Sequence, residues 1–227
     1  MKLPRSRQIH YHDPAIQAGE ALNLAAVCPR TRVLGPGWRA VVWVQGCPFQ
    51  CVGCVSPEWL DFKQAFSMHP EQLAENLLAD PQIRGLTFSG GEPMQQAAGL
   101  ARLAKSARAI REIDIISFSG YKLETLKKGI PDRSVFSLLD QLDVLIDGQY
   151  IQTLNDNRGM RGSSNQRVHK LTHRLADVDF NSLPRSSEVQ ILDGQVMLVG
   201  VPEERLLQAF YQAMWQMEDL QTQLVRR

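Results

Sequence analysis

The sequence predicts an α/β fold built around a parallel β-sheet. Short apolar and β-branched runs alternate along the chain with segments whose apolar residues recur at helical spacing, and this alternation is typical of βαβ units. The length of 227 residues suits one such domain with an appendage. The runs expected to form strands are 39–45, 85–89, 113–118 and 143–147.

The expected helices lie between these strands. Pro70 and Glu71 place a proline and an acid in a first helical turn, and Leu73 and Leu77 follow on one face. The segment 95–111 carries apolar residues at helical spacing along its length. Shorter helices are expected over 123–128 and 135–142.

The predicted core spans residues 31–180. One irregular region is expected before it and another within it. Residues 1–30 are expected to form an N-terminal extension with one short strand or helix within 16–27. The segment 155–166 is polar and has no core-forming pattern, so we expect a loop there. Such a loop is either solvated or lies over a ligand or a partner.

Residues 181–227 are expected to form a C-terminal extension made of a hairpin and a helix. The dipeptide Asp193-Gly194 lies between two alternating apolar runs, which is a strong hairpin signal. Residues 203–227 carry an apolar stripe at helical spacing. That stripe either packs on the core or binds another protein.

The composition excludes some classes of partner. The formal net charge is +1 and the pI is near 7.7, so no charge excess predicts binding to nucleic acid or to an anionic membrane. No apolar run approaches the roughly 20 residues of a membrane-spanning helix, and the first residues lack a secretory signal core. We therefore expect a cytoplasmic protein.

Three of the four cysteines lie close together, directly after the predicted strand 39–45. Cys47, Cys51 and Cys54 have the spacing C-x3-C-x2-C. Thiolates favour iron–sulfur clusters or zinc, and so short a loop can bring three sulfurs to one polynuclear centre. An iron atom left without a protein ligand would be free to bind a small molecule. The spacing therefore predicts an iron–sulfur cluster at which chemistry takes place.

Three other interpretations of these cysteines are open at this point. A structural zinc site needs four ligands, and the only further cysteine is Cys28, which precedes a proline. A redox C-x-x-C formed by Cys51 and Cys54 would leave Cys47 unexplained. Disulfides are disfavoured in a chain without a secretory signal. Cys28 is expected to be a buried or idle thiol.

A second motif follows the predicted strand 85–89. Gly90 and Gly91 would let the backbone approach a ligand closely, and Glu92 adds a carboxylate that can accept an ammonium group. A simple turn is the alternative. The next two strands carry Ser119 and Asp147 to the same edge of the sheet.

Together these motifs resemble the radical SAM proteins, and most closely the anaerobic ribonucleoside-triphosphate reductase activating protein group. The residues that carry the resemblance are Gly35-Pro36-Gly37, Gly46-Cys47 with Gly53-Cys54, Ser89-Gly90-Gly91-Glu92-Pro93, Ser119-Gly120-Tyr121-Lys122-Leu123, Asp143 to Gly148, and Arg161 to Gln166. They occur in this order and span about residues 33–170.

The resemblance implies a partial (β/α) barrel and an activating enzyme of the oxidoreductase class. Cys47, Cys51 and Cys54 would bind a 4Fe-4S cluster, at which one electron cleaves S-adenosylmethionine to a 5′-deoxyadenosyl radical. The residues implied to contact that cofactor are Gly53, Val55, Gly90, Gly91, Glu92, Ser119 and Asp147.

The same resemblance implies two protein partners. The electron would come from a flavodoxin-like or ferredoxin-like donor, and the substrate would be a glycyl-radical enzyme such as anaerobic ribonucleotide reductase. Two other functions remain as alternatives. One is a radical SAM enzyme that acts on a peptide or small molecule, and the other is an iron–sulfur protein that only transfers electrons or senses.

Overall fold

The computed structural model describes residues 13–192 and 195–225, and it contains a seven-stranded mixed sheet and a separate two-stranded hairpin. The strands of the large sheet are β1 (Leu22–Thr31), β2 (Arg39–Val44), β3 (Phe66–Met68), β4 (Gly85–Gly90), β5 (Asp114–Ser119), β6 (Val144–Asp147) and β7 (Arg167–Lys170). The hairpin consists of β8 (Ser187–Leu192) and β9 (Gln195–Gly200).

In the described part of the chain, one short helix precedes β1, other helices lie between the strands, and one helix follows the hairpin. The α-helices are α1 (Pro14–Gln17), α2 (Pro70–Leu77), α3 (Ala97–Ile110), α4 (Leu123–Leu126), α5 (Ser134–Leu139) and α6 (Glu204–Val225). Three short 3₁₀ turns are η1 (Pro57–Trp59), η2 (Pro93–Gln96) and η3 (Gln152–Leu154). No helix in the described part of the chain is long and apolar enough to cross a membrane.

The large sheet has the strand order β3-β1-β2-β4-β5-β6-β7. Its centre, β2-β4-β5-β6, is parallel, whereas β1, β3 and β7 pair antiparallel with their neighbours. The four parallel strands are those that the sequence predicts, so the α/β class is confirmed. Because they are parallel, the loops that follow them emerge at one edge of the sheet.

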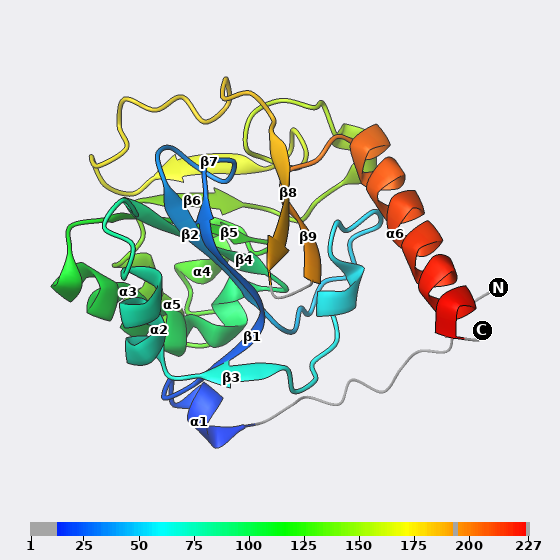
Figure 1. Cartoon of the computed structure of the whole chain (residues 1–227). Coiled ribbons are helices and arrows are strands. Elements are labelled where there is room, and N and C mark those ends of the chain that lie inside the picture. Colours follow the sequence, from blue (N-terminus) through cyan, green and yellow to red (C-terminus); the bar gives the residue numbers. More distant parts are fainter. Residues whose placement is uncertain (1–12, 193–194, 226–227) are drawn as a thin grey trace.

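The two faces of the sheet are covered by different parts of the chain. Along β2, Ala40 and Val42 point to the core under α2, α3 and α5, while Val41 and Trp43 pack with Val199 of the hairpin. This alternation is the period of two expected for a strand buried on both faces. In Figure 1, α2 to α5 gather on one side of the sheet, and α6 stands apart from them beside the hairpin.

The sequence predicts residues 1–30 to be irregular apart from one short strand or helix within 16–27, and the structure has more regular structure there than expected. Residues 22–31 form β1, a long and largely buried strand next to β2. Pro29 lies where the pairing register between β1 and β2 shifts, and an irregularity is one of the few places where a strand interior accepts proline. Residues 1–12 lie outside the described part of the chain.

Two further strands were not predicted. The edge strand β3 has only three residues, and β7 has the polar sequence Arg167-Val168-His169-Lys170, which shows little apolar pattern. β7 pairs antiparallel with β6, and its Arg167 also forms an ion pair with Asp147 of β6 at 2.7 Å. The predicted hairpin and C-terminal helix are present as β8-β9 and α6, although the turn residues 193–194 are outside the described residues.

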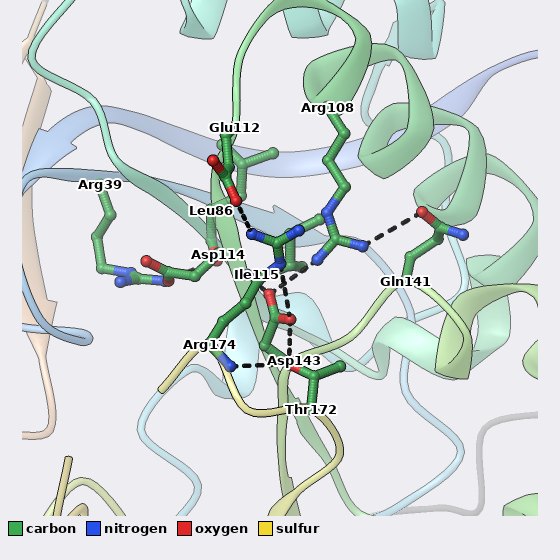
Figure 2. Close-up of polar contacts among 10 residues, drawn as sticks. All are labelled: Arg39, Leu86, Arg108, Glu112, Asp114, Ile115, Gln141, Asp143, Thr172 and Arg174. Atoms are coloured by element: carbon green, nitrogen blue, oxygen red, sulfur yellow. Dashed lines mark hydrogen bonds and ion pairs between the residues drawn. The ribbon is translucent and has the colours of Figure 1, made fainter. Parts of the chain in front are cut away.

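A network of charged side chains lies at the edge of the sheet where the parallel strands begin. The buried carboxylate of Asp143 accepts hydrogen bonds from the Ile115 N–H at 2.8 Å and the Thr172 hydroxyl at 2.6 Å, and it pairs with Arg108 at 2.8 Å. Figure 2 shows these groups converging on Asp143 from separate elements. The fully buried Arg39 binds Asp114 at 2.7 Å in the same region. Polar groups thus fix the edge of the sheet opposite the one from which the cysteine loop leaves.

We predict that Asp143→Ala lowers the free energy of unfolding by about 3 kcal/mol, because it leaves a partly buried guanidinium and a buried N–H without a partner. Denaturant unfolding followed by circular dichroism measures the change. The control is Glu71→Ala, which breaks an exposed pair with Arg102 and should cost less than about 1 kcal/mol. Equal losses in the two variants would show that the network does not stabilise the fold.

Candidate active site

The loop that carries the three cysteines leaves the end of β2 and is closed by backbone hydrogen bonds. The N–H of Gly46 donates to the carbonyl of Trp59, and the N–H of Cys47 donates to that of Leu60, both at 2.9 Å. Within the loop, Gly53 has a φ of +75°, a conformation that favours glycine. The start and end of the loop are therefore held together beside the sheet, and its middle turns back toward the strand ends.

The three cysteines line one cavity of about 420 Å³, a volume within the range of roughly 300–1,000 Å³ that small-molecule sites have. The predicted residues that line the same cavity are Gly53, Val55, Gly90, Gly91, Glu92 and Ser119. Asp147 does not line the cavity, whereas Gly148 next to it does. The fold therefore brings together nine of the ten predicted site residues, counting the three cysteines and these six, from three separate loops.

The fourth cysteine, Cys28, is not part of this cavity. It is buried under the hairpin, where it packs with Val41 and Val199, and its thiol donates a hydrogen bond to the Gln190 side chain at 3.0 Å. Burial raises the pKa of Cys28 to about 11. The position agrees with the expectation of a buried thiol.

The thiols of the cavity are held in their protonated form when no metal is bound. Burial, together with the nearby Glu92 and the other two cysteines, raises the pKa of Cys47 to about 12. Burial also raises the pKa values of Cys51 and Cys54. A metal cluster supplies the positive charge that removes these protons and stabilises the thiolates. The soft donor set and the shared cavity fit such a cluster.

The geometry is less suited to a single metal ion. Among the described residues, no three His, Cys, Asp or Glu side chains converge as ligands of one ion. A structural zinc ion needs four such ligands at one point. In a polynuclear cluster each thiolate binds a different iron atom, so the sulfurs need only surround a common volume.

Positions 90 and 91 require glycine, because a side chain at either one would clash with the backbone at the end of β2. A Cβ atom on Gly90 would lie 2.6 Å from the carbonyl oxygen of Val44, and one on Gly91 would lie 2.6 Å from the carbonyl carbon of Gly46. Gly90 also has a φ of +108°. The two glycines therefore let the end of β4 pack against the end of β2, with the N–H of Gly91 donating to the Val44 carbonyl at 2.8 Å.

Glu92 is buried at the cavity wall and accepts hydrogen bonds from neutral donors. Its Oε1 accepts from the Met94 N–H and the Ser119 hydroxyl, both at 2.9 Å, and its Oε2 accepts from the Gly120 N–H at 2.7 Å. Burial raises the pKa of Glu92 to about 7, although these hydrogen bonds lower it. No cationic side chain in the described part of the chain pairs with Glu92 at hydrogen-bond distance, so a bound cation would be favourable there.

Asp147 is engaged by residues that the sequence analysis did not single out. Its carboxylate accepts from the Leu123 N–H at 2.6 Å, pairs with Arg167 at 2.7 Å and lies 3.0 Å from His169 Nε2. Burial would raise the pKa of Asp147, but the hydrogen bonds from Arg167 and Leu123 bring it below its usual value. Asp147 thus joins β6, β7 and α4, and its predicted contact with the cofactor stays a prediction.

The C-terminal extension also lines the cavity, which the sequence analysis did not predict. Leu198, Gly200, Val201, Pro202, Glu204, Leu207 and Gln208 contribute to the wall, as does Arg185 just before the hairpin. The Tyr211 hydroxyl of α6 donates to the Val55 carbonyl at 3.1 Å, so the helix contacts the cysteine loop directly. Farther along α6, Trp215 is 68% exposed. No sequence pattern marks these contacts, because they arise only when the extension docks.

Comparisons with known proteins agree with this arrangement. The sequence profile described as a 4Fe-4S single cluster domain matches residues 33–169. The anaerobic ribonucleoside-triphosphate reductase-activating protein of Escherichia coli K12 is 34% identical over 158 residues, which is 66% of this chain and 99% of that protein. The protein of that name from Enterobacteria phage T4 is 33% identical over 152 residues, or 65% of this chain and 93% of that protein.

The chain therefore belongs to the 4Fe-4S single cluster domain family and, within it, to the group of the anaerobic ribonucleoside-triphosphate reductase-activating proteins. A shorter match is to a putative glycyl-radical enzyme activating enzyme of Haemophilus influenzae, 35% identical over 89 residues, or 38% of this chain and 34% of that protein. The predicted resemblance and the 4Fe-4S cluster are confirmed. The C-terminal extension lies beyond the matched segment, which ends at residue 169.

We predict that anaerobic reconstitution yields about four iron atoms per chain, because the three thiols line one cavity and the matched family binds a single 4Fe-4S cluster. Alanine at Cys47, Cys51 or Cys54 should abolish the brown absorbance. Cys28→Ala is the matched control and should keep the iron content of the wild type. Loss of the cluster in Cys28→Ala, or zinc in place of iron in the wild type, would contradict this assignment.

Proposed function

We propose that this protein is a radical SAM activating enzyme whose substrate is a glycyl-radical enzyme, such as an anaerobic ribonucleotide reductase. When bound, the 4Fe-4S cluster supplies an electron that cleaves S-adenosylmethionine to methionine and a 5′-deoxyadenosyl radical. The observation that carries the proposal is that the three cysteines and the Gly-Gly-Glu segment line one cavity at the ends of parallel strands.

In this proposal the cysteine loop binds the cluster, and the end of β4 binds S-adenosylmethionine. Cys47, Cys51 and Cys54 bind the cluster and leave one iron open. The backbone at Gly90 and Gly91 lies along the methionine moiety of the cofactor. Gly53 and Val55, which flank the last cysteine, lie against its adenosine.

Glu92 is proposed to accept the ammonium group of the same methionine moiety. Its carboxylate already holds three neutral donors and is buried, so the charge is oriented and little hydrated before the ligand binds. Ser119 positions Glu92 through its hydroxyl at 2.9 Å. Asp147 is proposed to support this edge through Leu123 and Arg167, next to Gly148 in the cavity wall.

We further propose that β2, β4, β5 and β6 with their helices form the partial (β/α) barrel of the radical SAM type. The support is that these strands are parallel and lie next to one another in the sheet, and that the cysteine loop follows the first of them. Residues 31–180 would be this core and residues 181–227 an extension, while a flavodoxin-like or ferredoxin-like protein would donate the electron.

We predict that the reduced, cluster-loaded protein converts S-adenosylmethionine to 5′-deoxyadenosine, detected by chromatography. Glu92→Gln should weaken cofactor binding roughly ten- to a hundredfold, because it removes a charge-assisted contact with the ammonium. It should leave the iron content unchanged. Glu58→Gln is the control, since Glu58 is exposed beside the cysteine loop and does not line the cavity.

The cleavage assay also decides between catalysis and simple electron transfer. A fully loaded, dithionite-reduced sample that forms no 5′-deoxyadenosine would favour a protein that only transfers electrons or senses. Equal cofactor affinity in the wild type and Glu92→Gln would remove Glu92 from the proposed site.

We predict that the hydrogen atom enters 5′-deoxyadenosine from a glycine of a partner protein. The partner would be the large glycyl-radical enzyme of the same organism, prepared with deuterated glycine. Mass spectrometry should find deuterium in the product, and electron paramagnetic resonance should find a glycyl radical on the partner. Cys54→Ala serves as the control without a cluster. Deuterium that enters from a labelled small molecule instead would support the alternative of a small-molecule enzyme.

A further inference from the structure

The hairpin β8-β9 has one face that packs on the large sheet. Met197 and Val199 of β9 belong to the apolar cluster that includes Val41 and Trp43 of β2. On β8, the side chain of Gln190 accepts a hydrogen bond from the Cys28 thiol at 3.0 Å. These residues define the inner face of the hairpin, and this face is covered by the protein itself.

The opposite face of the hairpin is also apolar. Side chains alternate between the two faces of a strand, and residues directly opposite each other share a face. The outer face therefore carries Val189 and Ile191 of β8 with their register partners Leu198 and Val196 of β9. Val189 is 56% exposed and Ile191 is 72% exposed. A strand face that is open to water normally carries polar residues, so four apolar residues here need a reason.

The outer face is continuous with the cavity. Leu198 belongs to the outer face and also lines the cavity wall. Exposed apolar side chains flank the cavity in two other segments as well, because Val52 is adjacent to Gly53 and Ile151 is adjacent to Gln152 in the sequence. Gly53 and Gln152 both line the cavity. A large molecule that reaches into the cavity therefore meets apolar side chains from three segments of the chain.

This arrangement fits a protein better than a small ligand. A ligand held within the cavity would leave the exposed Val189 and Ile191 in water. Contiguous exposed apolar surface of this kind marks a site of protein association. In the proposed function the substrate is a protein whose glycine must enter the cavity. The surface that surrounds this glycine is then brought against whatever borders the cavity, including the outer face.

We propose that the outer face of the hairpin binds an apolar surface of the glycyl-radical enzyme, next to the loop that carries its glycine. The inference rests on the proposed function and adds a docking surface to it. The hairpin lies beyond residues 33–169, so this contact is additional to the matched family segment. The C-terminal extension thereby takes part in recognition of the partner.

Val189 and Ile191 are suitable positions for a test because both are exposed and neither lines the cavity. The variants are Val189→Glu, Ile191→Glu and Ile191→Lys. Charges of both signs distinguish the loss of an apolar contact from simple repulsion or attraction by the partner. The matched controls are Ile110→Glu and Ile110→Lys, since Ile110 is an exposed residue at the end of α3, among the helices on the other side of the sheet.

The experiment measures the Kd between each cluster-loaded variant and the purified glycyl-radical enzyme of the same organism by anaerobic biolayer interferometry. Electron paramagnetic resonance measures the glycyl radical formed at limiting and at saturating concentrations of the partner. Iron content, circular dichroism and the formation of 5′-deoxyadenosine without the partner establish that each variant is folded and active. Light scattering after size-exclusion chromatography gives the mass of each variant alone.

We expect all three hairpin variants to raise the Kd for the partner roughly tenfold or more, because each places a charge in an apolar contact. Radical formation should fall at limiting partner and recover at saturating partner. The formation of 5′-deoxyadenosine without the partner should equal that of the wild type. Both Ile110 variants should bind the partner as the wild type does.

Three results would overturn the inference. The first is a wild-type Kd in the hairpin variants, and the second is an equal loss in the Ile110 controls. The third is a wild-type dimer that the hairpin variants dissociate while they keep their affinity for the partner, because a second copy of the chain would then cover the outer face. A wild-type protein that cleaves S-adenosylmethionine but neither binds nor activates a glycyl-radical enzyme would overturn the proposed substrate itself.

Discussion

The close approach of two backbones, at the ends of β2 and β4, determines how the site is assembled. Gly90 and Gly91 have no side chains, and so the N–H of Gly91 reaches the Val44 carbonyl at 2.8 Å and the N–H of Glu92 reaches that of Gly46 at 2.9 Å. These two hydrogen bonds join the start of the cysteine loop to the residues that follow β4. A Cβ at either glycine would clash with the backbone at the end of β2 and push the two strand ends apart.

The carboxylates of the protein are stabilised in two different ways. Asp143 pairs with Arg108 of α3, and Asp147 pairs with Arg167 of the neighbouring strand β7, so both carboxylates already have a counter-charge. Glu92 and Arg185, by contrast, are held only by neutral partners although both are wholly or partly buried. Burying a charge without a counter-charge is unfavourable, so the buried Glu92 favours a ligand that carries a positive charge. The carboxylates that stabilise the fold thus pair with cations within the protein, whereas Glu92 at the site does not.

The cavity wall combines a segment that the family shares with one that lies beyond it. The matched segment, residues 33–169, supplies the cysteines and the strand ends, while β9 and α6 supply a further part of the wall. The hairpin reaches this position because Val199 packs with Val41 and Trp43 on the face of the sheet that the helices leave uncovered. The contact of Tyr211 with Val55 then sets α6 beside the cysteine loop. The two reductase-activating proteins named above align with about two thirds of this chain, and the residues of β9 and α6 in this wall lie beyond the matched family segment.

The sequence by itself determined the parallel strands, the cysteine loop and the Gly-Gly-Glu segment, because periodicity, ligand spacing and glycine placement are local properties. It predicted only a short strand or helix within 16–27 where β1 lies, and it did not reveal β7. Pro29 and the polar residues around Arg167 obscure the strand pattern, and both strands depend on pairing with distant neighbours. Only the tertiary structure decided that Gly90 and Gly91 contact the protein's own backbone, that Asp147 faces Arg167, and that Arg185 enters the cavity wall. These are contacts between residues far apart in the chain, and they exist only after the sheet, the hairpin and the C-terminal helix have packed together.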